Sequence, residues 1–212
     1  VLEGPVNNAE NYAERIRTYL VPPVTGSYTF WIASDDQGSL LLSSDSDPAN
    51  AIEIASVPYW ANPREYGKYP EQRSDAISLV AGEVYFLEAK MKEGGGGDNL
   101  SVAWEYPGQS QQVIPASYGR IPIPQWSESP TMAPTSMAPT TMAPTTTTAM
   151  PTSLDLGTGA SIETWTNVGG TTLNAIDWNS NPTFSSVIPG DGNAVLEGPV
   201  NNAENYAERI RT

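Results

Sequence analysis

Two adjacent carboxylates, Asp35 and Asp36, are the residues of this sequence best placed to do chemistry. They lie in the polar stretch SDDQG between two apolar runs, and short polar side chains closed by Gly38 are typical of a tight turn. Two neighbouring acids at a loop tip repel each other unless a cation or hydrogen-bond donors compensate their charge. The pair therefore indicates either a cation site or a solvated turn whose carboxylates cap backbone amides.

The residues on both sides of the pair predict two strands. Tyr28, Phe30 and Ile32 alternate with other residues in the period of two that a sheet strand requires, and β-branched and aromatic residues dominate. The run 40–42 consists of three leucines, so we expect it to be buried on both faces. We expect residues 25–44 to form a hairpin with the two acids at its apex.

Composition and charge restrict the function. The formal net charge is −14, from 24 acidic and 10 basic residues, which disfavours nucleic acid and anionic membranes and favours divalent cations. The chain has no cysteine and no histidine, which excludes disulfides, thiol nucleophiles, thiolate zinc sites and imidazole bases. No apolar run approaches the ~20 residues that a membrane-spanning helix needs. We therefore expect no enzyme, no nucleic-acid partner and no membrane insertion.

An internal repeat determines the domain organisation. Residues 1–18 recur without a change at 195–212, which indicates a tandem array with a period of 194 residues. On this basis residues 1–125 form the main part of a β-sandwich and residues 126–153 form a linker. Residues 154–212 would then hold the first strands of the next repeat's sandwich.

The remaining pattern predicts an all-β fold. Residues 83–92 and 100–106 alternate apolar and polar side chains, and short apolar runs elsewhere are separated by Gly and Pro turns. Four glycines, Gly94 to Gly97, form a loop that depends on the free backbone of glycine. We expect a two-sheet antiparallel β-sandwich with essentially no helix.

The linker has a composition of its own. Residues 130–153 contain no charged side chain and are rich in Pro and Thr, which favours an extended, polyproline-like spacer. Dense Thr beside Pro is also typical of O-glycosylated stalks, although an unmodified disordered linker has the same composition. The candidate glycosylation sites are Thr131, Thr135, Thr140, Thr141, Thr145, Thr146, Thr147, Thr148 and Thr152.

Taken in the order that the array gives, the sequence resembles a known family. The matching stretches are TWTNVGG near Trp165, NYAERIRTYLVPPVTGSYTFWIASDDQG, YWANPREYGKYPEQRS, ISLVAGEVYFLEAKMKEGGGGDNLSVAWEYPG and VIPASY. They resemble the β-sandwich lectin family of anthrax protective antigen and the flocculins, the PA-fourteen domain. The resemblance implies a two-sheet antiparallel sandwich in a secreted, extracellular or cell-surface protein, since members occur in toxins, adhesins, glycosidases and flocculins.

The resemblance also implies a metal site. In sugar-binding members, adjacent aspartates joined by a cis peptide hold one Ca²⁺, which in turn coordinates vicinal hydroxyls of a sugar; Asp35 and Asp36 match this motif. Ca²⁺ takes six to eight oxygen ligands, so a second loop is needed, and the glycine loop with Asp98 and Asn99 is the candidate. Asp98 and Asn99 fit an ordinary turn as well, and Asn99 begins an Asn-Leu-Ser glycosylation sequon. A glycan on Asn99 would exclude it as a ligand.

Aromatic residues supply the candidate sugar platform. Trp60, Tyr59 and Tyr66 follow the strand at 51–57 and offer apolar surface against which a sugar ring can pack. Gln37, next to the acid pair, is a further carbohydrate-binding candidate. The aromatic residues fit core or rim packing equally well.

Two functions compete. The first is a calcium-dependent carbohydrate-binding repeat of a large secreted adhesin, with glycans and neighbouring repeats as partners. The second is a structural filament in which strands of neighbouring repeats complete each sandwich, without glycan binding. An accessory domain of a carbohydrate-active enzyme is disfavoured, because the sequence shows no catalytic partner domain. The adjacent acids themselves do not offer hydrolysis, which needs two carboxylates about 5–10 Å apart in opposed environments.

Overall fold

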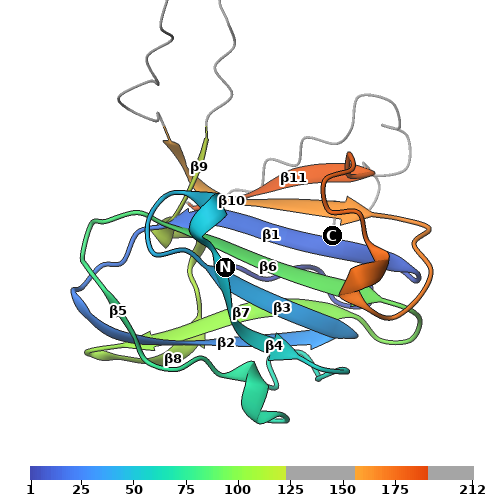
Figure 1. Cartoon of the computed structure of the whole chain (residues 1–212), viewed down its shortest axis with the longest axis horizontal. Helices are drawn as coiled ribbons and strands as arrows, with labels where there is room; N and C mark the ends of the chain where they lie inside the picture. Colours follow the sequence, from blue (N-terminus) through green and yellow to red (C-terminus); the bar gives the residue numbers. More distant parts are fainter. Residues whose placement is uncertain (123–155, 191–212) are drawn as a thin grey trace, which may run out of the picture.

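The computed structural model describes residues 1–122 and 156–190, and these residues form two antiparallel sheets (Figure 1). The larger sheet has the strand order β11 (Phe184–Pro189), β10 (Leu156–Trp165), β9 (Gly119–Pro122), β1 (Tyr12–Leu20), β6 (Tyr85–Glu93), β3 (Gln37–Leu42) and β4 (Ile52–Val57). The smaller sheet has the order β5 (Ile77–Leu79), β2 (Gly26–Asp35), β7 (Asn99–Tyr106) and β8 (Gln109–Val113). The predicted all-β sandwich is confirmed.

Helical structure in the described ranges is limited to short 3-10 turns. These are η1 (Pro48–Asn50), η2 (Pro70–Gln72), η3 (Ala116–Tyr118) and η4 (Leu173–Ala175). None of the helices seen in 1–122 and 156–190 has the length and apolarity that crossing a bilayer requires. The predicted linker at 126–153, with its nine candidate threonines, lies outside the described residues.

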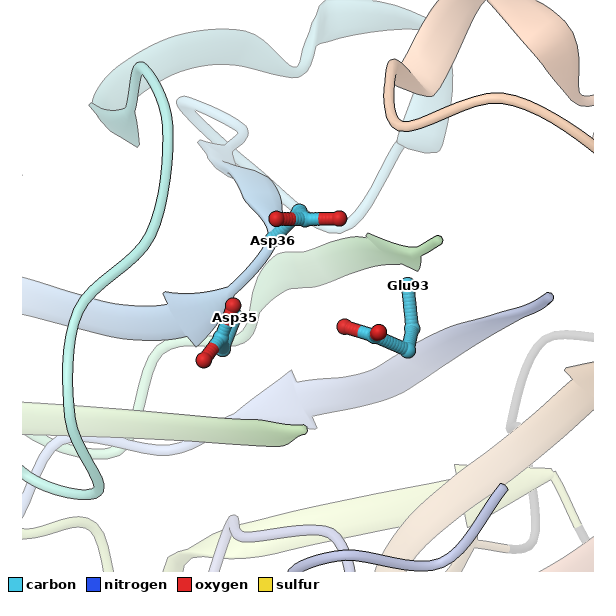
Figure 2. A group of neighbouring side chains, drawn as sticks. All are labelled: Asp35, Asp36 and Glu93. Carbon is cyan, nitrogen blue, oxygen red and sulfur yellow. The ribbon is translucent and has the colours of Figure 1, made fainter. Parts of the chain in front are cut away.

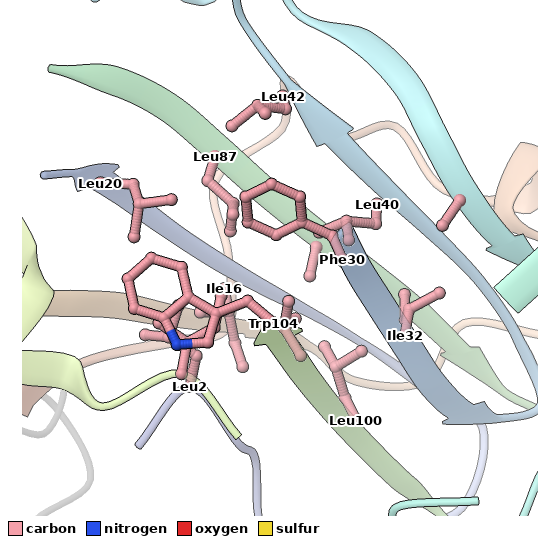
Figure 3. Packing of buried hydrophobic residues seen from close by; sticks show 14 of the residues in the cluster. Leu2, Ile16, Leu20, Phe30, Ile32, Leu40, Leu42, Leu87, Leu100 and Trp104 are labelled. Carbon is pink, nitrogen blue, oxygen red and sulfur yellow. The ribbon is translucent and has the colours of Figure 1, made fainter. Parts of the chain in front are cut away.

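The hydrophobic core lies between the two sheets (Figure 3). Leu20, Leu40 and Leu87 from the larger sheet pack with Phe30 and Trp104 from the smaller one, and all five side chains are fully buried. Each buried side chain of this size stabilises the fold by roughly 1.5–3 kcal/mol relative to an exposed one. The alternating patterns of the sequence therefore identify the inward faces correctly for β6 and β7.

The predicted hairpin at residues 25–44 is wrong. β2 pairs with β5 and β7 in one sheet, whereas β3 pairs with β4 and β6 in the other. The physical reason is that Phe30 and Leu40 are both fully buried, and the two strands bury their apolar faces against each other across the core. Asp36 is consequently the residue at which the chain crosses from one sheet to the other, at one end of the sandwich.

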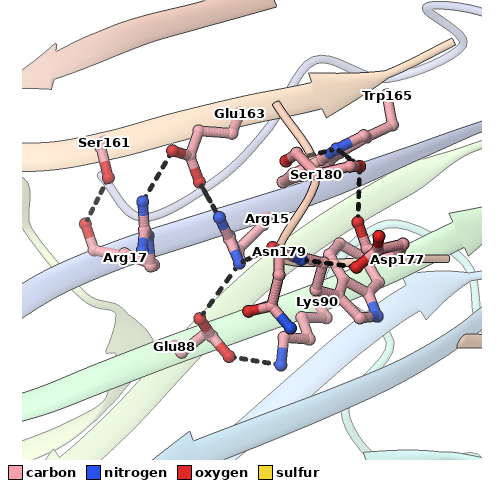
Figure 4. A network of polar contacts seen from close by, with 11 residues as sticks. Arg15, Arg17, Glu88, Lys90, Ser161, Glu163, Trp165, Asp177, Asn179 and Ser180 are labelled. Atoms are coloured by element: carbon pink, nitrogen blue, oxygen red, sulfur yellow. Dashed lines mark hydrogen bonds and ion pairs between the residues drawn. The ribbon is translucent and has the colours of Figure 1, made fainter. Parts of the chain in front are cut away.

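The segment 156–190 extends the larger sheet. β10 pairs with β1 from Ala13↔Trp165 to Arg17↔Ser161 and also with β9. Glu163 on β10 forms ion pairs with Arg15 at 2.7 Å and Arg17 at 2.6 Å (Figure 4). Residues 156–190, which the sequence assigns to the next repeat's sandwich, here pack on β1. Whether this segment packs on β1 of its own period or of the next period in an array is not decided by this packing, and the assignment to the next repeat stays a prediction.

Candidate functional site

Three carboxylates converge at the end of the sandwich where β2 crosses into β3. Asp35 ends β2, Asp36 follows it, and Glu93 ends β6. Each offers an oxygen atom, and these atoms all lie within 4.8 Å of one another. Figure 2 shows the carboxylate of Glu93 directed toward the two aspartates. The Asp35–Asp36 peptide bond is cis, as the resemblance implies.

Backbone hydrogen bonds hold this group in place. The N–H of Asp36 donates to the carbonyl oxygen of Lys92 at 3.2 Å, which ties the crossing to the end of β6. Oδ2 of Asp36 accepts the N–H of Gly94 at 3.0 Å, and the Ser34 hydroxyl donates to the Asp36 carbonyl at 2.9 Å. Glu93 is fully buried, yet neither of its carboxylate oxygens has a hydrogen-bond partner among the described residues. A buried charged carboxylate without a donor is expensive, so this arrangement favours the protonated acid or a neighbouring positive charge.

Burial and neighbouring carboxylates raise the pKa of two of the three acids, Asp35 and Glu93. Burial is the main cause that raises the pKa of Asp35 to about 6, and the neighbouring Asp36 adds to it, whereas Lys68 opposes it. Burial also raises the pKa of Glu93 to about 7, with further contributions from Asp36 and Asp35. Desolvation and like charge are the expected causes where carboxylates share a partly desolvated site.

Two lysines lie near the acid group. The ammonium group of Lys68 lies over the ring of Trp60 and has no hydrogen-bond partner in the described part of the chain. Lys92 is fully buried and donates to the carbonyl oxygen of Glu93; burial lowers its pKa, while Glu93 and Asp36 raise it. Sequence reasoning missed both lysines, and it missed Glu93. The available signal for Glu93 was its position directly before the glycine loop.

The glycine loop lies beside the acids, as expected for the second loop of the site. A side chain at position 94 would come within 3.2 Å of Oδ2 of Asp36, and one at position 97 within 3.6 Å of Oδ2 of Asp35. Gly96 has a φ of +124°, a conformation that other residues rarely adopt. The absence of side chains lets this backbone approach both aspartates.

Asp98 and Asn99, the predicted ligands of that loop, have different surroundings. Asp98 is buried, and its two oxygens accept hydrogen bonds from the Tyr12 hydroxyl at 3.0 Å and the Ala9 N–H at 3.1 Å. It is not one of the three clustered acids. Asn99 lies opposite Asp35 in the β2–β7 ladder, and its Nδ2 donates to the carbonyl oxygen of Ala61 at 2.9 Å. Oδ1 of Asn99 is buried without a hydrogen-bond partner in the described ranges, so Asn99 retains a free oxygen.

Of the predicted aromatic residues, Trp60 is the one that pairs with the acid group. It forms an isolated bridge with Asp35, and 45% of its surface is exposed. The hydroxyl of Tyr66 instead donates to Oγ of Ser101 at 3.0 Å, and burial raises the pKa of Tyr66 to about 12. Tyr59 is largely exposed. Oε1 of Gln37 accepts the N–H of Leu173 at 2.9 Å, so this oxygen already has a partner within the protein.

Another buried acid lies beyond the group of three. Glu14 is 1% exposed, and neither of its carboxylate oxygens has a hydrogen-bond partner within 1–122 and 156–190. Burial raises its pKa to about 8, and the negative charge of Asp98 contributes. The end of the sandwich thus collects more negative charge than its hydrogen bonds compensate.

Comparison with known proteins agrees with this architecture. The model of the PA14 domain family matches residues 3–118, which include the acid pair, the glycine loop and most strands of both sheets. The chain belongs to the PA14 domain family.

Curated relatives share part of this domain. Fibrocystin from Canis lupus familiaris is 32% identical over 87 residues, which are 37% of this chain and 2% of the relative. N-acetyl-beta-glucosaminyl-glycoprotein 4-beta-N-acetylgalactosaminyltransferase 1 from Mus musculus is 32% identical over 116 residues, which are 51% of this chain and 11% of the relative. The chain thus spans only a small part of the length of these curated relatives.

The similarity to solved structures is lower. The epithelial adhesin 6 A domain from Candida glabrata, in complex with Galβ1-3GlcNAc, has a TM-score of 0.38 and 17% identity, with 49% of this chain and 48% of that chain covered. The PA14 sugar-binding domain of an RTX adhesin has a TM-score of 0.36 and 14% identity, with 49% of this chain and 51% of that chain covered.

Proposed function

We propose that this domain binds glycans through a calcium ion held by Asp35, Asp36 and Glu93, and that it acts as a repeat unit of an extracellular adhesin. The observation that carries the proposal is the fully buried Glu93, whose unpartnered carboxylate points toward the adjacent aspartates. Three carboxylates, a free oxygen on Asn99 and nearby loop carbonyls suit a hard cation that prefers oxygen ligands. When bound, Ca²⁺ would neutralise the acids and offer coordination positions to sugar hydroxyls.

The surroundings of the acids support a saccharide as the ligand. Trp60 exposes an aromatic face next to Asp35, and sugar rings pack well on such faces. Lys68 lies over the same ring and close enough to Asp35 to affect its pKa, so it can donate to an acceptor on a bound ligand. The domain also belongs to a family whose sugar-binding members carry the paired aspartates that Asp35 and Asp36 match. Together these residues favour a binding site.

A glycan array tests this proposal. The wild-type chain should bind in Ca²⁺ and lose the signal in EDTA, and galactosyl-GlcNAc glycans are suitable first probes. Asp36→Asn should abolish binding. Trp60→Ala should reduce binding at least tenfold while Ca²⁺ still raises the melting temperature. Ile52→Ala is the control, because Ile52 is exposed and pairs with Leu42 at the end of β3 away from the acids. Binding that persists in EDTA would contradict the proposal.

A second candidate function, a structural array, is favoured by the internal repeat. The identical residues 195–212 contain a copy of residues 12–18 of β1, so Ala13, Arg15 and Arg17 recur as Ala207, Arg209 and Arg211. In residues 1–122 it is Arg15 and Arg17 that pair with Glu163 of β10. One β10–β11 segment therefore has two copies of the strand to which it can bind, and in an array it can complete the sandwich of the following period.

The end of β11 supports docking on the following period. A side chain at Gly190 would contact the backbone of Ser117 at 3.2 Å, and the N–H of Leu2 donates to the nearby carbonyl of Ile114 at 2.8 Å. The segment thus ends, at Gly190, close to the start of the domain. Only residues 191–194 separate Gly190 from residues 195–212, the second copy of residues 1–18.

Engineered disulfides distinguish the two arrangements, since the natural sequence has no cysteine. In a chain of two periods, Ser161→Cys would be combined with Arg17→Cys or with Arg211→Cys, because residues 17 and 161 are register partners. Docking on the following period predicts that the pair 161–211 oxidises and the pair 161–17 does not. The reverse result would contradict this second function.

A further inference from the structure

The segment 156–190 reaches the candidate site. After β10, the chain passes over the outer face of the larger sheet, where Trp165 and Ile176 form a small buried cluster with Ala13 of β1. Trp178 lies against Lys90 of β6, whose ammonium is 5.4 Å from its ring centre. Residues 166–175, between Trp165 and Ile176, run toward the end of β6, where the acids lie.

The loop Val168–Leu173 makes specific contacts there. The N–H of Val168 donates to the carbonyl oxygen of Asn11 at 2.8 Å, and the N–H of Leu173 donates to Oε1 of Gln37 at 2.9 Å. At position 94 a side chain would meet Cγ2 of Thr171 at 2.5 Å. The loop therefore rests on Gln37 and Gly94 with no space for a side chain at position 94.

Both contact points are the chain neighbours of the acids. Gln37 directly follows Asp36, and Gly94 directly follows Glu93. The N–H of Gly94 also donates to Asp36, and its carbonyl accepts the N–H of Asn11 at 3.2 Å. The loop thus packs on the side chain of Gln37 and on Gly94, the residues that directly follow two of the three carboxylates.

We propose that cation binding at Asp35, Asp36 and Glu93 and docking of the loop Val168–Leu173 strengthen each other. This inference rests on the proposed calcium site and concerns its regulation. Without a cation, the three carboxylates repel each other, and this repulsion displaces the backbone at Gln37 and Gly94. A cation draws the acids together and fixes the surface that the loop contacts. By linkage, the docked loop must raise cation affinity by the same factor as the cation stabilises docking.

The consequence concerns the array. If the segment 156–190 docks on the following period, calcium at one site tightens the joint between adjacent periods. Loss of calcium loosens the joint at the same time as it removes the sugar site. The joint between periods would thus be stiff, and the sugar site formed, over the same range of calcium concentration.

Amide hydrogen exchange on the full chain tests the coupling. In Ca²⁺, the exchange rates of the Val168 and Leu173 amides should be at least about fivefold lower than in EDTA, in line with typical allosteric coupling. The amide of Ala51, bonded locally to the carbonyl of Pro48, should not change. In Asp36→Asn, Ca²⁺ should leave all three rates unchanged.

A second measurement works from the other side of the contact. Gln37→Leu removes the acceptor for Leu173 and should weaken Ca²⁺ binding about fivefold in calorimetry, whereas Gln111→Leu, at an exposed position of β8, should not. Calcium binding with unchanged exchange at Val168 and Leu173 would overturn the coupling and leave the proposed function intact. Absence of calcium binding to the wild type would overturn the proposed function itself.

Discussion

The N–H of Leu173 donates a hydrogen bond to Oε1 of Gln37 across a sequence separation of 136 residues. Gln37 follows the acid pair, so this bond brings the segment 156–190 to the edge of the candidate site. The site is consequently built from both described parts of the chain. Stability, cation affinity and docking of the segment are therefore expected to change together in variants at this end of the sandwich.

Glu93→Gln should have opposite effects in the two forms of the protein. In EDTA at a pH well above 7, where Glu93 is charged, the neutral amide removes a buried charge that repels Asp35 and Asp36, so the unfolding free energy should rise by about 1–3 kcal/mol. In Ca²⁺, the loss of a ligand should remove most of the increase in melting temperature. Differential scanning fluorimetry compares both conditions, with Glu83→Gln, an exposed glutamate, as control. A wild-type calcium response in Glu93→Gln would exclude Glu93 as a ligand.

Gly94→Ala should disturb the site through sterics alone. The added methyl group would meet Thr171 at 2.5 Å and Asp36 at 3.2 Å, and overpacking of this kind typically costs about 1–3 kcal/mol. Calcium affinity should fall in parallel. Gly67→Ala is the matched control, because a methyl group there meets nothing within 4 Å. Equal stability of the two variants in chemical denaturation would show that the loop does not pack on Gly94.

Glu14 should make stability depend on pH. Its folded pKa of about 8 lies above its ordinary value of 4.5, so the folded state binds the proton more tightly than the unfolded state. Its stabilising contribution is present below pH 4.5 and is lost as the pH rises through 8. Glu14→Gln should therefore gain on the order of a few kcal/mol over the wild type at high pH and little at pH 4.5. Denaturant unfolding in EDTA across this range measures the difference, and a constant difference would contradict the assignment.

Glu163→Gln should loosen the segment 156–190. This carboxylate pairs with both Arg15 and Arg17, and Arg15 also stacks on Trp165 at 4.8 Å. The loss should cost about 1–3 kcal/mol, because Arg15 keeps its ion pair with Glu88 at 3.8 Å and the Arg17 side chain is partly exposed. Amides in the β1–β10 ladder should exchange faster, while those in β2–β7 keep their rates. Glu71→Gln, at an exposed position of η2, should change neither ladder.

Much of the fold was predictable from local patterns. The alternating residues of β6 and β7 identified their inward faces, because one face of each strand packs on a single core. The hairpin prediction failed at β2 and β3, since both a hairpin and a sheet crossing place a polar turn between two apolar runs. Only the pairing with β6 and β7, far away in sequence, decides between them.

The site was predictable in part for the same reason. Asp35 and Asp36 are adjacent in sequence, so their proximity needed no fold. Glu93, Lys68 and the loop Val168–Leu173 reach the site through sheet pairing and chain packing over long sequence separations. The spacing of residues in the sequence does not predict such contacts, and a structure was needed to find them.

Isothermal titration of the full wild-type chain with CaCl₂, after EDTA treatment and dialysis, tests the central claim most directly. The account predicts one site per chain, with a dissociation constant of about 0.1–1 mM or tighter, as in other extracellular calcium modules. Asp36→Asn should abolish this binding. If the wild type shows no binding heat and no calcium-dependent change in melting temperature at millimolar Ca²⁺, Asp35, Asp36 and Glu93 do not form a calcium site.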